Sequence, residues 1–475
     1  MRRLLFWLVL ILFPLTISAQ EVEYDLVFMG GQVYDPETKL NKILHVGIRN
    51  GKIEKLSEAK LKGKREIDIK GLFLCPGFID LHVHGTTPVE QQFQLHDGVT
   101  TALDLEFGYE PIKKFIEKRT DSSLVNFGAS ANHQRLRRRA MKDFADDANT
   151  AERVDYYNNK TLSADERVKM NELLRKEVDD GALGIGVSVG YYLGASRREI
   201  YDVYKLAKEL QVPIFSHLRD AKALSVQQAV ADAMTTGASL HIVHINSTSA
   251  DEIDLTLEMI GNARKRGYDI TTEVYPYTAG STGITTTIFR EGWQERLGIG
   301  YGDLQWSDTG ERLTKESFDT YRKKGGVVII HSMKPEWIRQ AIQSPLTLIA
   351  SDGMTYAKFA HPRTAGTFSR VLGKYVREEK VLTLTEAIDK MTLMPAKRLE
   401  AFAPGMKKKG RIQEGCDADI TVFDPATIID KATFEGGLKF SEGIHYVVVN
   451  GTLMIDKGKT VPHVFPGKPI LSKSK

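Results

Sequence analysis

The sequence predicts an α/β protein: a (β/α)8 barrel of the TIM type, joined to a small β-sandwich domain built from both the N- and C-terminal segments. Two observations predict this fold. Between residues 78 and 399, apolar strand-like runs alternate with helical patterns, as expected for a parallel barrel. On either side of that region, residues 20–77 and 400–475 show short runs of alternating apolar and polar residues separated by turn signals.

The first 19 residues have the pattern of a secretory signal peptide. Two arginines precede the apolar run LLFWLVLILFPL, and small residues lead to a cleavage position after Ala19. A retained membrane anchor is the alternative, but the run is short for a span and Pro14 interrupts it. We therefore expect residues 1–19 to be removed and the mature chain to be secreted without a membrane attachment, with the periplasm as the expected compartment.

Composition and charge exclude several classes of protein. The chain has 475 residues, 42% hydrophobic and 27% charged, which is typical of a folded globular protein. Its net charge is +4, and removal of the two arginines in residues 1–19 lowers it to +2. Such a balance gives no reason to expect nucleic acid as a partner. The two cysteines, Cys75 and Cys416, are too few for a disulfide scaffold, and we expect both to be buried. The oligomeric state is left open.

The two ends of the chain are expected to form one β-domain. Residues 20–77 contain YDLVFMGGQVYDPETK, LHVGIRNGKIEKLS and REIDIKGLFLCPG, which read as strands joined by hairpins. The same texture returns within 400–475 as ADITVFDPATI and IHYVVVNGTLMIDKG. Since neither end has enough strands for a sandwich of its own, we predict that the ends combine.

Nine strand-like runs compete for the eight strands of the barrel. We exclude the run at 326–331 from the barrel, because residues from about 279 to 345 have the pattern of an insertion after the seventh strand. The nine runs cover residues 78–85, 99–106, 125–130, 182–189, 212–218, 240–245, 269–277, 326–331 and 346–352.

Histidines and carboxylates stand at the ends of five of these strands. Side chains two residues apart on a strand share a face, so His82 and His84 in FIDLHVHG point the same way. In a parallel barrel the carboxyl ends of all strands meet at one mouth, where the chemistry is found. Imidazole and carboxylate groups are the nitrogen and oxygen ligands that zinc prefers. The candidate metal ligands are His82, His84, Glu106, His217, His244 and Asp352.

Each candidate has a structural alternative when it is taken alone. An isolated HxH pair is more often a satisfied polar pair, Asp352 before a glycine can be a turn residue, and Glu106 can pair with a nearby cation. His241 is left out because it lies three residues before His244 and so faces the opposite way on a regular strand. The coincidence at five strand ends favours a metal site over these alternatives.

The chain resembles the amidohydrolase superfamily and, within it, the group of N-acyl-D-amino-acid deacylases. The resemblance runs from about residue 70 to 450, nearly the whole expected mature chain. Its motifs are PGFIDLHVHG, DGVTTALDLE, GALGIGVSVGYYLGAS, FSHLRD, EVYPYTAGST, IASDG, HPRTAGTFSRVLGKYV, MTLMPAKRL and GRIQEGCDADITVFDP.

The resemblance implies roles for five of the candidate ligands. His82 and His84 match the strand-1 ligands of a first metal position, and His217 and His244 match the strand-5 and strand-6 ligands of a second. Asp352 matches the strand-8 aspartate that contacts metal and handles protons in catalysis.

The resemblance also implies substrate contacts and shows two departures. Arg363, in HPR, matches the arginine that binds the substrate carboxylate, and Tyr192 and Tyr275 fall where the group places tyrosines near the substrate. Many members carry a cysteine ligand at the end of strand 2, where this chain has Glu106, so one or two Zn²⁺ ions are possible and a bridging carboxylate is one option. Asn246 stands near the substrate where some members have a lysine, which leaves the preferred side chain open.

The function expected from the resemblance is that of a secreted zinc-dependent hydrolase. It would remove the acyl group from N-acyl-D-amino acids, or cleave small peptides ending in a D-residue, by attack of a metal-activated hydroxide with Asp352 as base and then acid. One alternative is an amidohydrolase acting on cyclic imides, cyclic amides or dipeptides. Another is a metal-binding homologue without catalysis. The motifs around Arg363 favour the first, with a small molecule as the expected partner.

Overall fold

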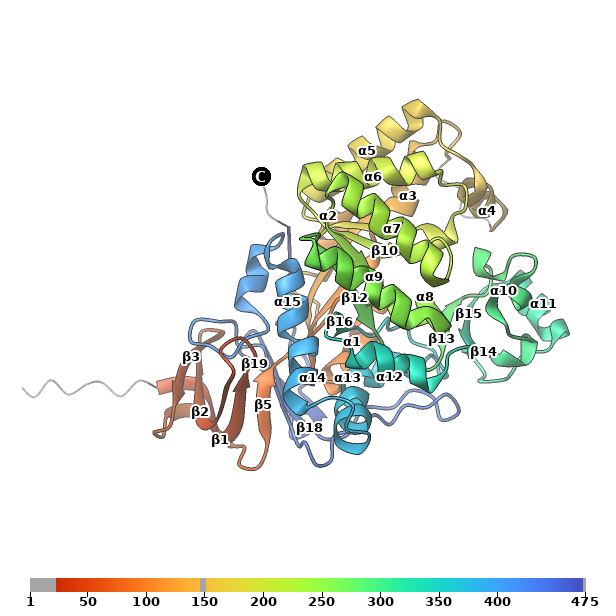
Figure 1. Cartoon of the computed structure of the whole chain (residues 1–475). Helices are drawn as coiled ribbons and strands as arrows, with labels where there is room; N and C mark the ends of the chain where they lie inside the picture. Colours follow the sequence, from red (N-terminus) through yellow and green to blue (C-terminus); the bar gives the residue numbers. More distant parts are fainter. Residues whose placement is uncertain (1–22, 146–150, 473–475) are drawn as a thin grey trace, which may run out of the picture.

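The computed structural model of the chain describes residues 23–145 and 151–472 (Figure 1). The expected signal peptide at residues 1–19 lies outside the described part. Within the described ranges, no helix combines the length and apolar character needed to cross a membrane.

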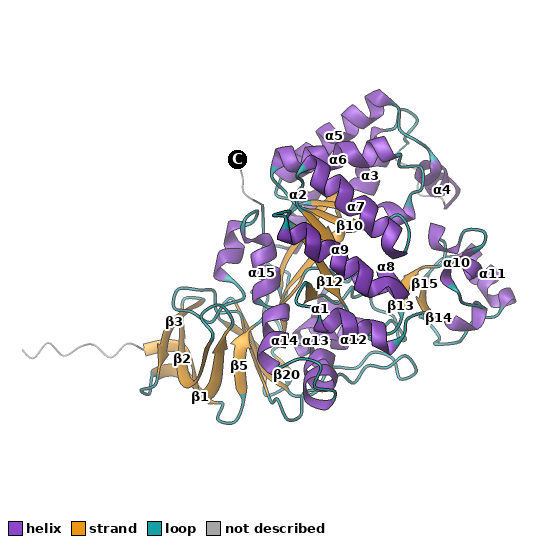
Figure 2. Ribbon diagram, viewed as in Figure 1, coloured by secondary structure: helices purple, strands orange, loops and turns teal. Residues whose placement is uncertain are grey.

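Eight parallel strands form the centre of the molecule, which confirms the predicted barrel (Figure 2). Neighbours along the chain pair with one another in strand order, except that β12 pairs directly with β16 across the intervening insertion. The strands are β6 (Phe78–Asp80), β7 (Val99–Tyr109), β8 (Asn126–Asn132), β9 (Ile185–Ser188), β10 (Ile214–His217), β11 (Leu240–Ile242), β12 (Ile270–Val274) and β16 (Thr347–Ile349).

The sheet is brought to closure at its carboxyl-terminal mouth. Val83 forms a parallel bridge with Gly353, and the backbone N–H of His84 donates to the carbonyl of Gly353 over 2.7 Å. These contacts join the segment after β6 to the segment after β16, so side chains from the first and last strands of the barrel meet at the mouth.

Helices cover the outer face of the barrel (Figure 2). Apolar side chains of α5, α6, α7 and α9 join the strands in one large buried cluster, which is the main source of stability for the barrel. The helices are α1 (Pro88–His96), α2 (Ile112–Arg119), α3 (His133–Ala140), α4 (Ala151–Asn159), α5 (Ala164–Asp179), α6 (Arg197–Leu210), α7 (Lys222–Thr236), α8 (Ile245–Ser249), α9 (Ile253–Lys265), α12 (Pro335–Gln343), α13 (Arg363–Arg370), α14 (Leu384–Met391) and α15 (Leu393–Glu400).

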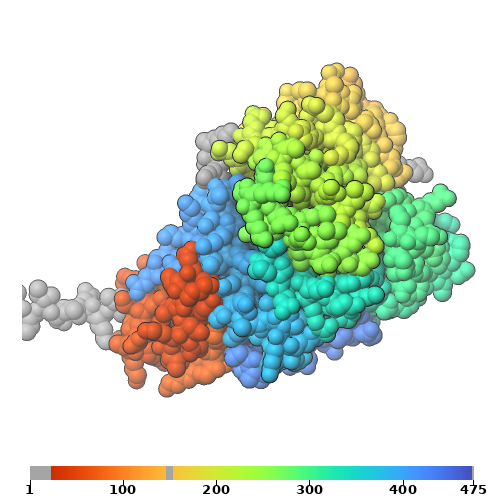
Figure 3. All heavy atoms as spheres, in the orientation of Figure 1, coloured from red at the N-terminus to blue at the C-terminus, as the bar shows by residue number. Residues whose placement is uncertain are grey.

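Strands from both ends of the chain share a second, nine-stranded sheet, as the sequence predicts. Its junction is the antiparallel pairing of β5 with β17, in which Cys75 lies opposite Thr421. Figure 3 shows the N-terminal strands, in red and orange, against the blue C-terminal part of the chain. The strands are β1 (Glu23–Asp35), β2 (Leu40–Arg49), β3 (Lys52–Ser57), β4 (Lys62–Asp68), β5 (Phe73–Pro76), β17 (Ile420–Phe423), β18 (Ile444–Val449), β19 (Thr452–Asp456) and β20 (Lys459–Thr460).

The expected insertion contains a three-stranded antiparallel sheet outside the barrel (Figure 1). It consists of β13 (Gly280–Gly283), β14 (Leu304–Trp306) and β15 (Val327–Ile330), with α10 (Trp293–Leu297) and α11 (Lys315–Lys324) beside them. Its own apolar cluster is built around Trp293, Trp306 and Phe318. The strand-like run at 326–331 therefore belongs to this small sheet.

The start of α13 is held in place by two close contacts. The backbone at Gly366 departs from helical geometry, and a Cβ at that position would lie 2.6 Å from Cβ of Asp430, so only glycine fits. The carboxylate of Asp97 accepts hydrogen bonds from the backbone N–H groups of Phe368 (2.8 Å) and Ser369 (2.9 Å). These contacts fix the helix whose first residue is Arg363.

Both cysteines are buried and unpaired. Cys75 lies within β5, while Cys416 lies in the segment leading to β17.

Candidate metal centre

The structure brings all six predicted ligands together at the mouth of the barrel. His82 and His84 follow β6, Glu106 lies within β7, and His217 ends β10. His244 lies between β11 and α8, and Asp352 follows β16. The six are assembled because the carboxyl ends of parallel barrel strands converge.

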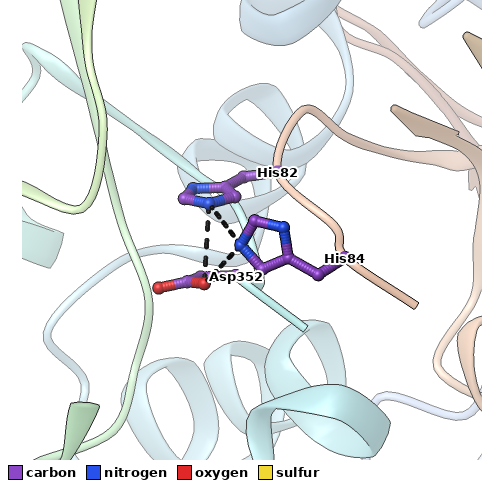
Figure 4. Close-up of side chains that lie close together, drawn as sticks. All are labelled: His82, His84 and Asp352. Carbon is purple, nitrogen blue, oxygen red and sulfur yellow. Dashed lines mark hydrogen bonds and ion pairs between the residues drawn. The ribbon is translucent and has the colours of Figure 1, made fainter. Parts of the chain in front are cut away.

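The first group of potential ligands consists of His82, His84 and Asp352, which point toward one another in Figure 4. The Nε2 atoms of the two histidines are 3.2 Å apart. Oδ1 of Asp352 lies 3.5 Å from Nε2 of His82 and 3.3 Å from Nε2 of His84. Three ligand atoms from three side chains thus face one point.

The second group consists of Glu106, His217 and His244. Oε1 of Glu106 lies 2.7 Å from Nδ1 of His217 and 3.6 Å from Nε2 of His244. The two histidine nitrogens are 3.0 Å apart. A Cβ at Gly190 would lie 2.8 Å from Cδ2 of His217, so a residue without a side chain is needed beside this ring.

Glu106 connects the two groups through its two carboxylate oxygens. While Oε1 faces His217, Oε2 lies 3.2 Å from Nε2 of His82 and 3.1 Å from Nε2 of His84. The Glu106 side chain is buried, so its two oxygens contact these histidines and not solvent. One carboxylate oxygen of Glu106 is thus presented to each ligand group.

The donor chemistry of the site fits metal binding. The carboxylate of Glu273 lies 2.5 Å from Nδ1 of His82, which places the ring proton on Nδ1. Nε2 of His82 faces Glu106, Asp352 and His84, so it is the ring nitrogen that can bind a metal ion once it has lost its proton. A cation is the group that satisfies such a cluster of acceptors, and nitrogen with oxygen ligands suits zinc.

The electrostatics of the bare ligands agree with this view. Burial lowers the pKa of His84, but the Asp352 and Glu106 carboxylates raise it to about 9. Burial raises the pKa of Asp352, but Arg363 and His82 hold it well below its usual value. The carboxylates therefore stay ionised in a buried site, where they attract positive charge.

Two of the candidate ligands have a backbone conformation that is unfavourable for residues other than glycine. His244 has φ +33° and Asp352 has φ +52°. Such conformations cost on the order of 1–3 kcal/mol each and cluster at functional sites, where the surrounding structure holds them.

A cavity of about 430 Å³ opens beside the ligands. Tyr275 and Arg363 contribute to its wall on one side, and residues of the insertion such as Ser281 and Thr282 contribute to another. The guanidinium of Arg363 lies over the ring of Tyr275 at 4.5 Å and forms an ion pair of 2.9 Å with Asp352.

Comparisons with known proteins agree with the fold. The model of the amidohydrolase family matches residues 256–455. An N-acyl-D-glutamate deacylase of Alcaligenes xylosoxydans xylosoxydans is 27% identical over 90% of this chain and 93% of its own length, and a D-aminoacylase of the same organism is 25% identical over 90% and 94%. The structure of an N-acyl-D-glutamate deacylase of Bordetella bronchiseptica, solved with zinc and a phosphonate mimic of the tetrahedral intermediate, has a TM-score of 0.82 at 23% identity, covering 95% of this chain and all of that one.

These comparisons confirm the resemblance to the amidohydrolase family and to its N-acyl-D-amino-acid deacylases. The chain is also similar to a dihydroorotase of Syntrophus aciditrophicus, at 23% identity over 93% of the chain and 98% of that protein.

Of the residues expected to contact the substrate, two line the cavity and two do not. Tyr275 and Arg363 line the cavity, as the resemblance implies. Two N–H groups of Arg363, on Nε and Nη1, are buried without a hydrogen-bond partner among the described residues. A buried donor without a partner is costly, and a ligand that accepts both bonds removes the cost.

Tyr192 and Asn246 do not line the cavity. The Tyr192 hydroxyl contacts Nδ1 of His133 over 2.7 Å, and it is Tyr191 that lines the cavity, with its ring 4.5 Å from that of His217. A 3₁₀ turn at Val189–Tyr191 sends the two neighbouring rings in different directions. Asn246 is fully buried and donates to the carbonyl of Tyr275 over 3.3 Å.

Two side chains at the site were missed by sequence reasoning. Glu273 lies one residue before the end of β12 and contacts His82, and His241 contacts Glu273 over 2.8 Å. The signal for Glu273 was present, because it is a carboxylate at a strand end in EVYPY. His241 was set aside on the parity of a regular strand, but β11 ends at Ile242 and the left-handed backbone of His244 breaks that parity.

Proposed function

We propose that this chain is a zinc-dependent amide hydrolase that releases the acyl group from N-acyl-D-amino acids, or cleaves small peptides ending in a D-residue. The observation that carries the proposal is the pairing of Arg363 with Asp352 directly beside the two ligand groups bridged by Glu106. The relatives named as N-acyl-D-glutamate deacylase and D-aminoacylase support the same assignment.

The proposed division of labour follows from the positions of the side chains. His82, His84 and Asp352 would hold one ion, and His217 and His244 would hold the second. Glu106 would contribute one carboxylate oxygen to each. When bound, the metal pair supplies Lewis acidity that polarises the scissile carbonyl and makes water a stronger acid.

Asp352 is the group that moves the proton. Its carboxylate is ionised because Arg363 and His82 lower its pKa against the effect of burial. It can therefore accept a proton on a carboxylate oxygen from the attacking water and return it to the departing amine.

Arg363 is proposed to hold the α-carboxylate of the substrate. Its unpartnered Nε and Nη1 groups offer two donors, and the ring of Tyr275 limits its movement. With the carboxylate and the scissile carbonyl both fixed, the side chain on the α-carbon can point only one way. This arrangement gives a physical basis for selecting one enantiomer.

The charges on the cavity wall favour an anionic substrate over a dipeptide with a free amine. Apart from the ligand groups, the charged residues that line it are Arg138, Arg219, Arg290, Arg296, Arg363, Asp155 and Asp220. Arg138 donates to the neutral oxygen of Asn158, and Arg219 donates to backbone carbonyls. An ammonium group would meet a wall with an excess of positive charge.

Secretion is the second part of the proposal, and it is supported by the pattern of residues 1–19 alone. Cell fractionation with N-terminal sequencing of the recovered protein tests it. A protein that begins near Gln20 in the periplasmic or medium fraction is expected, whereas an intact N-terminus in the cytoplasm would contradict it.

The deciding experiment is an enantiomer panel. Purified protein loaded with zinc is assayed for amine release from matched N-acetyl-D- and N-acetyl-L-amino acids with acidic, basic, apolar and aromatic side chains. Hydrolysis confined to the D series is expected. Activity on L substrates, or none with metal bound, would refute the deacylase assignment, and cyclic amides and dipeptides in the same panel would then identify the alternative.

A further inference from the structure

Glu273 is a buried carboxylate that belongs to neither ligand group but contacts both. It lies one residue before the end of β12, and its side chain is 2% exposed. Oε1 lies 2.5 Å from Nδ1 of His82, in the first group. The same oxygen accepts a weaker hydrogen bond of 3.4 Å from the backbone N–H of His244, in the second group.

We propose that Glu273 is a positioning residue that fixes one histidine ligand in each group. This inference rests on the proposed metal-dependent function and extends it to a residue outside the ligand set. The carboxylate acts only through the histidines that it holds.

The first part of the argument concerns the ring of His82. A carboxylate only accepts, so the hydrogen bond to Nδ1 requires a proton on that nitrogen and directs the other ring nitrogen, Nε2, at the ligand cluster. If the ring turned over, a C–H group would face Glu273. The carboxylate therefore selects the orientation of the ring that presents Nε2 to a metal ion.

The second part concerns His244. Its backbone is left-handed at φ +33°, a conformation that a non-glycine residue keeps only when its surroundings hold it. The contact from its N–H to Oε1 of Glu273 is one such restraint, and Ser247 holds the side chain through Nδ1 over 3.0 Å. Loss of Glu273 would thus affect both ligand groups.

The third part explains what holds Glu273 itself. Oε2 lies 2.8 Å from Nε2 of His241, and Nδ1 of His241 lies 2.7 Å from the hydroxyl of Thr271. The hydroxyl donates to Nδ1 and Nε2–H donates to the carboxylate, so each polar atom in this chain of contacts has a partner. His241 is fully buried and acts as the anchor of Glu273.

The test compares Glu273→Gln with Glu177→Gln. The second variant is a matched control, because Glu177 is a buried carboxylate on α5 that accepts from the backbone N–H of Ile112, far from the ligands. Zinc affinity and stoichiometry are measured by competition with a chelator. The visible spectrum of the cobalt-substituted protein reports the ligand geometry, and thermal unfolding without metal reports stability.

The expected result is a roughly 10- to 100-fold loss of zinc affinity in Glu273→Gln, the size seen when residues that hold metal ligands are replaced. A changed cobalt spectrum is expected with it, while Glu177→Gln keeps wild-type affinity and spectrum. Wild-type affinity, stoichiometry and spectrum in folded Glu273→Gln would overturn the proposal, whatever happens to activity.

Two further variants keep the inference testable if Glu273→Gln does not fold. His241→Gln removes the anchor and is expected to lower zinc affinity with a smaller spectral change, and unaltered binding there would also overturn the proposal. Glu273→Asp keeps the charge with a shorter reach, so partial recovery of affinity relative to the Gln variant is expected. Failure of the wild-type protein to deacylate D substrates, with zinc bound and these shifts present, would refute the proposed function alone.

Discussion

The guanidinium of Arg363 lies 2.9 Å from Oδ1 of Asp352, so the proposed carboxylate-binding residue pairs with the proposed proton-transfer residue. A substrate carboxylate would compete for Arg363 and so weaken its hold on Asp352. Binding at one end of the substrate is thereby coupled to the basicity of the group that acts at the other.

Replacement of Arg363 by lysine is expected to reduce kcat/KM for N-acyl-D-amino acids by roughly 10- to 100-fold. Lysine keeps the charge but loses the planar fork, and one hydrogen bond to a charged group contributes about 1.5–3 kcal/mol. Steady-state kinetics on a D substrate and on its carboxamide analogue check this, because loss of carboxylate binding should lower kcat/KM more for the acid than for the carboxamide.

Arg370→Lys is the control for that prediction. Arg370 lies on the same helix and pairs with Asp430, outside the cavity lining. If Arg363→Lys lowered kcat/KM by the same factor for the acid and for the carboxamide, Arg363 would not bind the carboxylate.

Glu106→Gln is expected to bind fewer than two zinc ions per chain. The amide presents one weakly coordinating oxygen, whereas the carboxylate faces His217 with one oxygen and His82 with the other. Metal analysis after dialysis against buffered zinc gives the stoichiometry. Glu177→Gln, on α5, is the control because Glu177 belongs to neither ligand group and accepts a hydrogen bond from the backbone N–H of Ile112. Two tightly bound ions in Glu106→Gln would show that Glu106 does not bridge.

Zinc affinity is expected to rise with pH between 6.5 and 8.5. Although burial lowers the pKa of His84, Asp352 and Glu106 raise it to about 9 in the metal-free protein, so the imidazole is protonated throughout this window. Zinc requires the neutral ring, so binding releases a proton and weakens as the pH falls. Chelator competition corrected for the chelator's own protonation measures the slope, and a flat profile would contradict the assignment of His84 as a ligand.

Substrates with a second negative charge are expected to bind more tightly than neutral ones. N-succinyl-D-alanine and N-acetyl-D-glutamate carry that charge on the acyl group and on the side chain, respectively, and N-acetyl-D-alanine is the reference. The double variant Arg138→Gln/Arg219→Gln should raise KM for the doubly charged substrates, with a smaller effect at high salt.

Arg139→Gln is the control for this pair. Arg139 follows Arg138 on α3 but pairs with Glu110 and does not line the cavity. Equal KM values for all three substrates in the wild-type protein would refute the expectation.

Strand periodicity was sufficient to predict the barrel and which residues meet at its mouth. His82, Glu106 and Asp352 could be grouped without coordinates because parallel strands bring their ends together. Side chains whose direction depends on an irregular backbone could not be placed. Because of a 3₁₀ turn, Tyr191 lines the cavity, where Tyr192 was expected, and Tyr192 contacts His133.

The role of Glu273 was also beyond the reach of the sequence. It depends on the contact of its carboxylate with His82, a residue of a strand far away in the chain. His241 lies within β11, but the strand ends at Ile242, so the alternation of side chains does not extend from His241 to His244. Pairwise contacts between side chains of different strands are set by packing, which periodicity does not encode.

The pairing of β5 with β17 has a consequence for biosynthesis. β5 lies near the start of the chain, so it can pair with β17 only after almost all of the remaining residues have been synthesised. β17 also pairs with β18, which is synthesised later still. Contacts between such distant segments form late and slowly, because the loop between them must first be closed. The edge of β5 stays open during translation, and the second sheet is completed only after the barrel segment has left the ribosome. A chain truncated before Ile420 would keep every side chain of the metal centre and still lack the partner strand of β5.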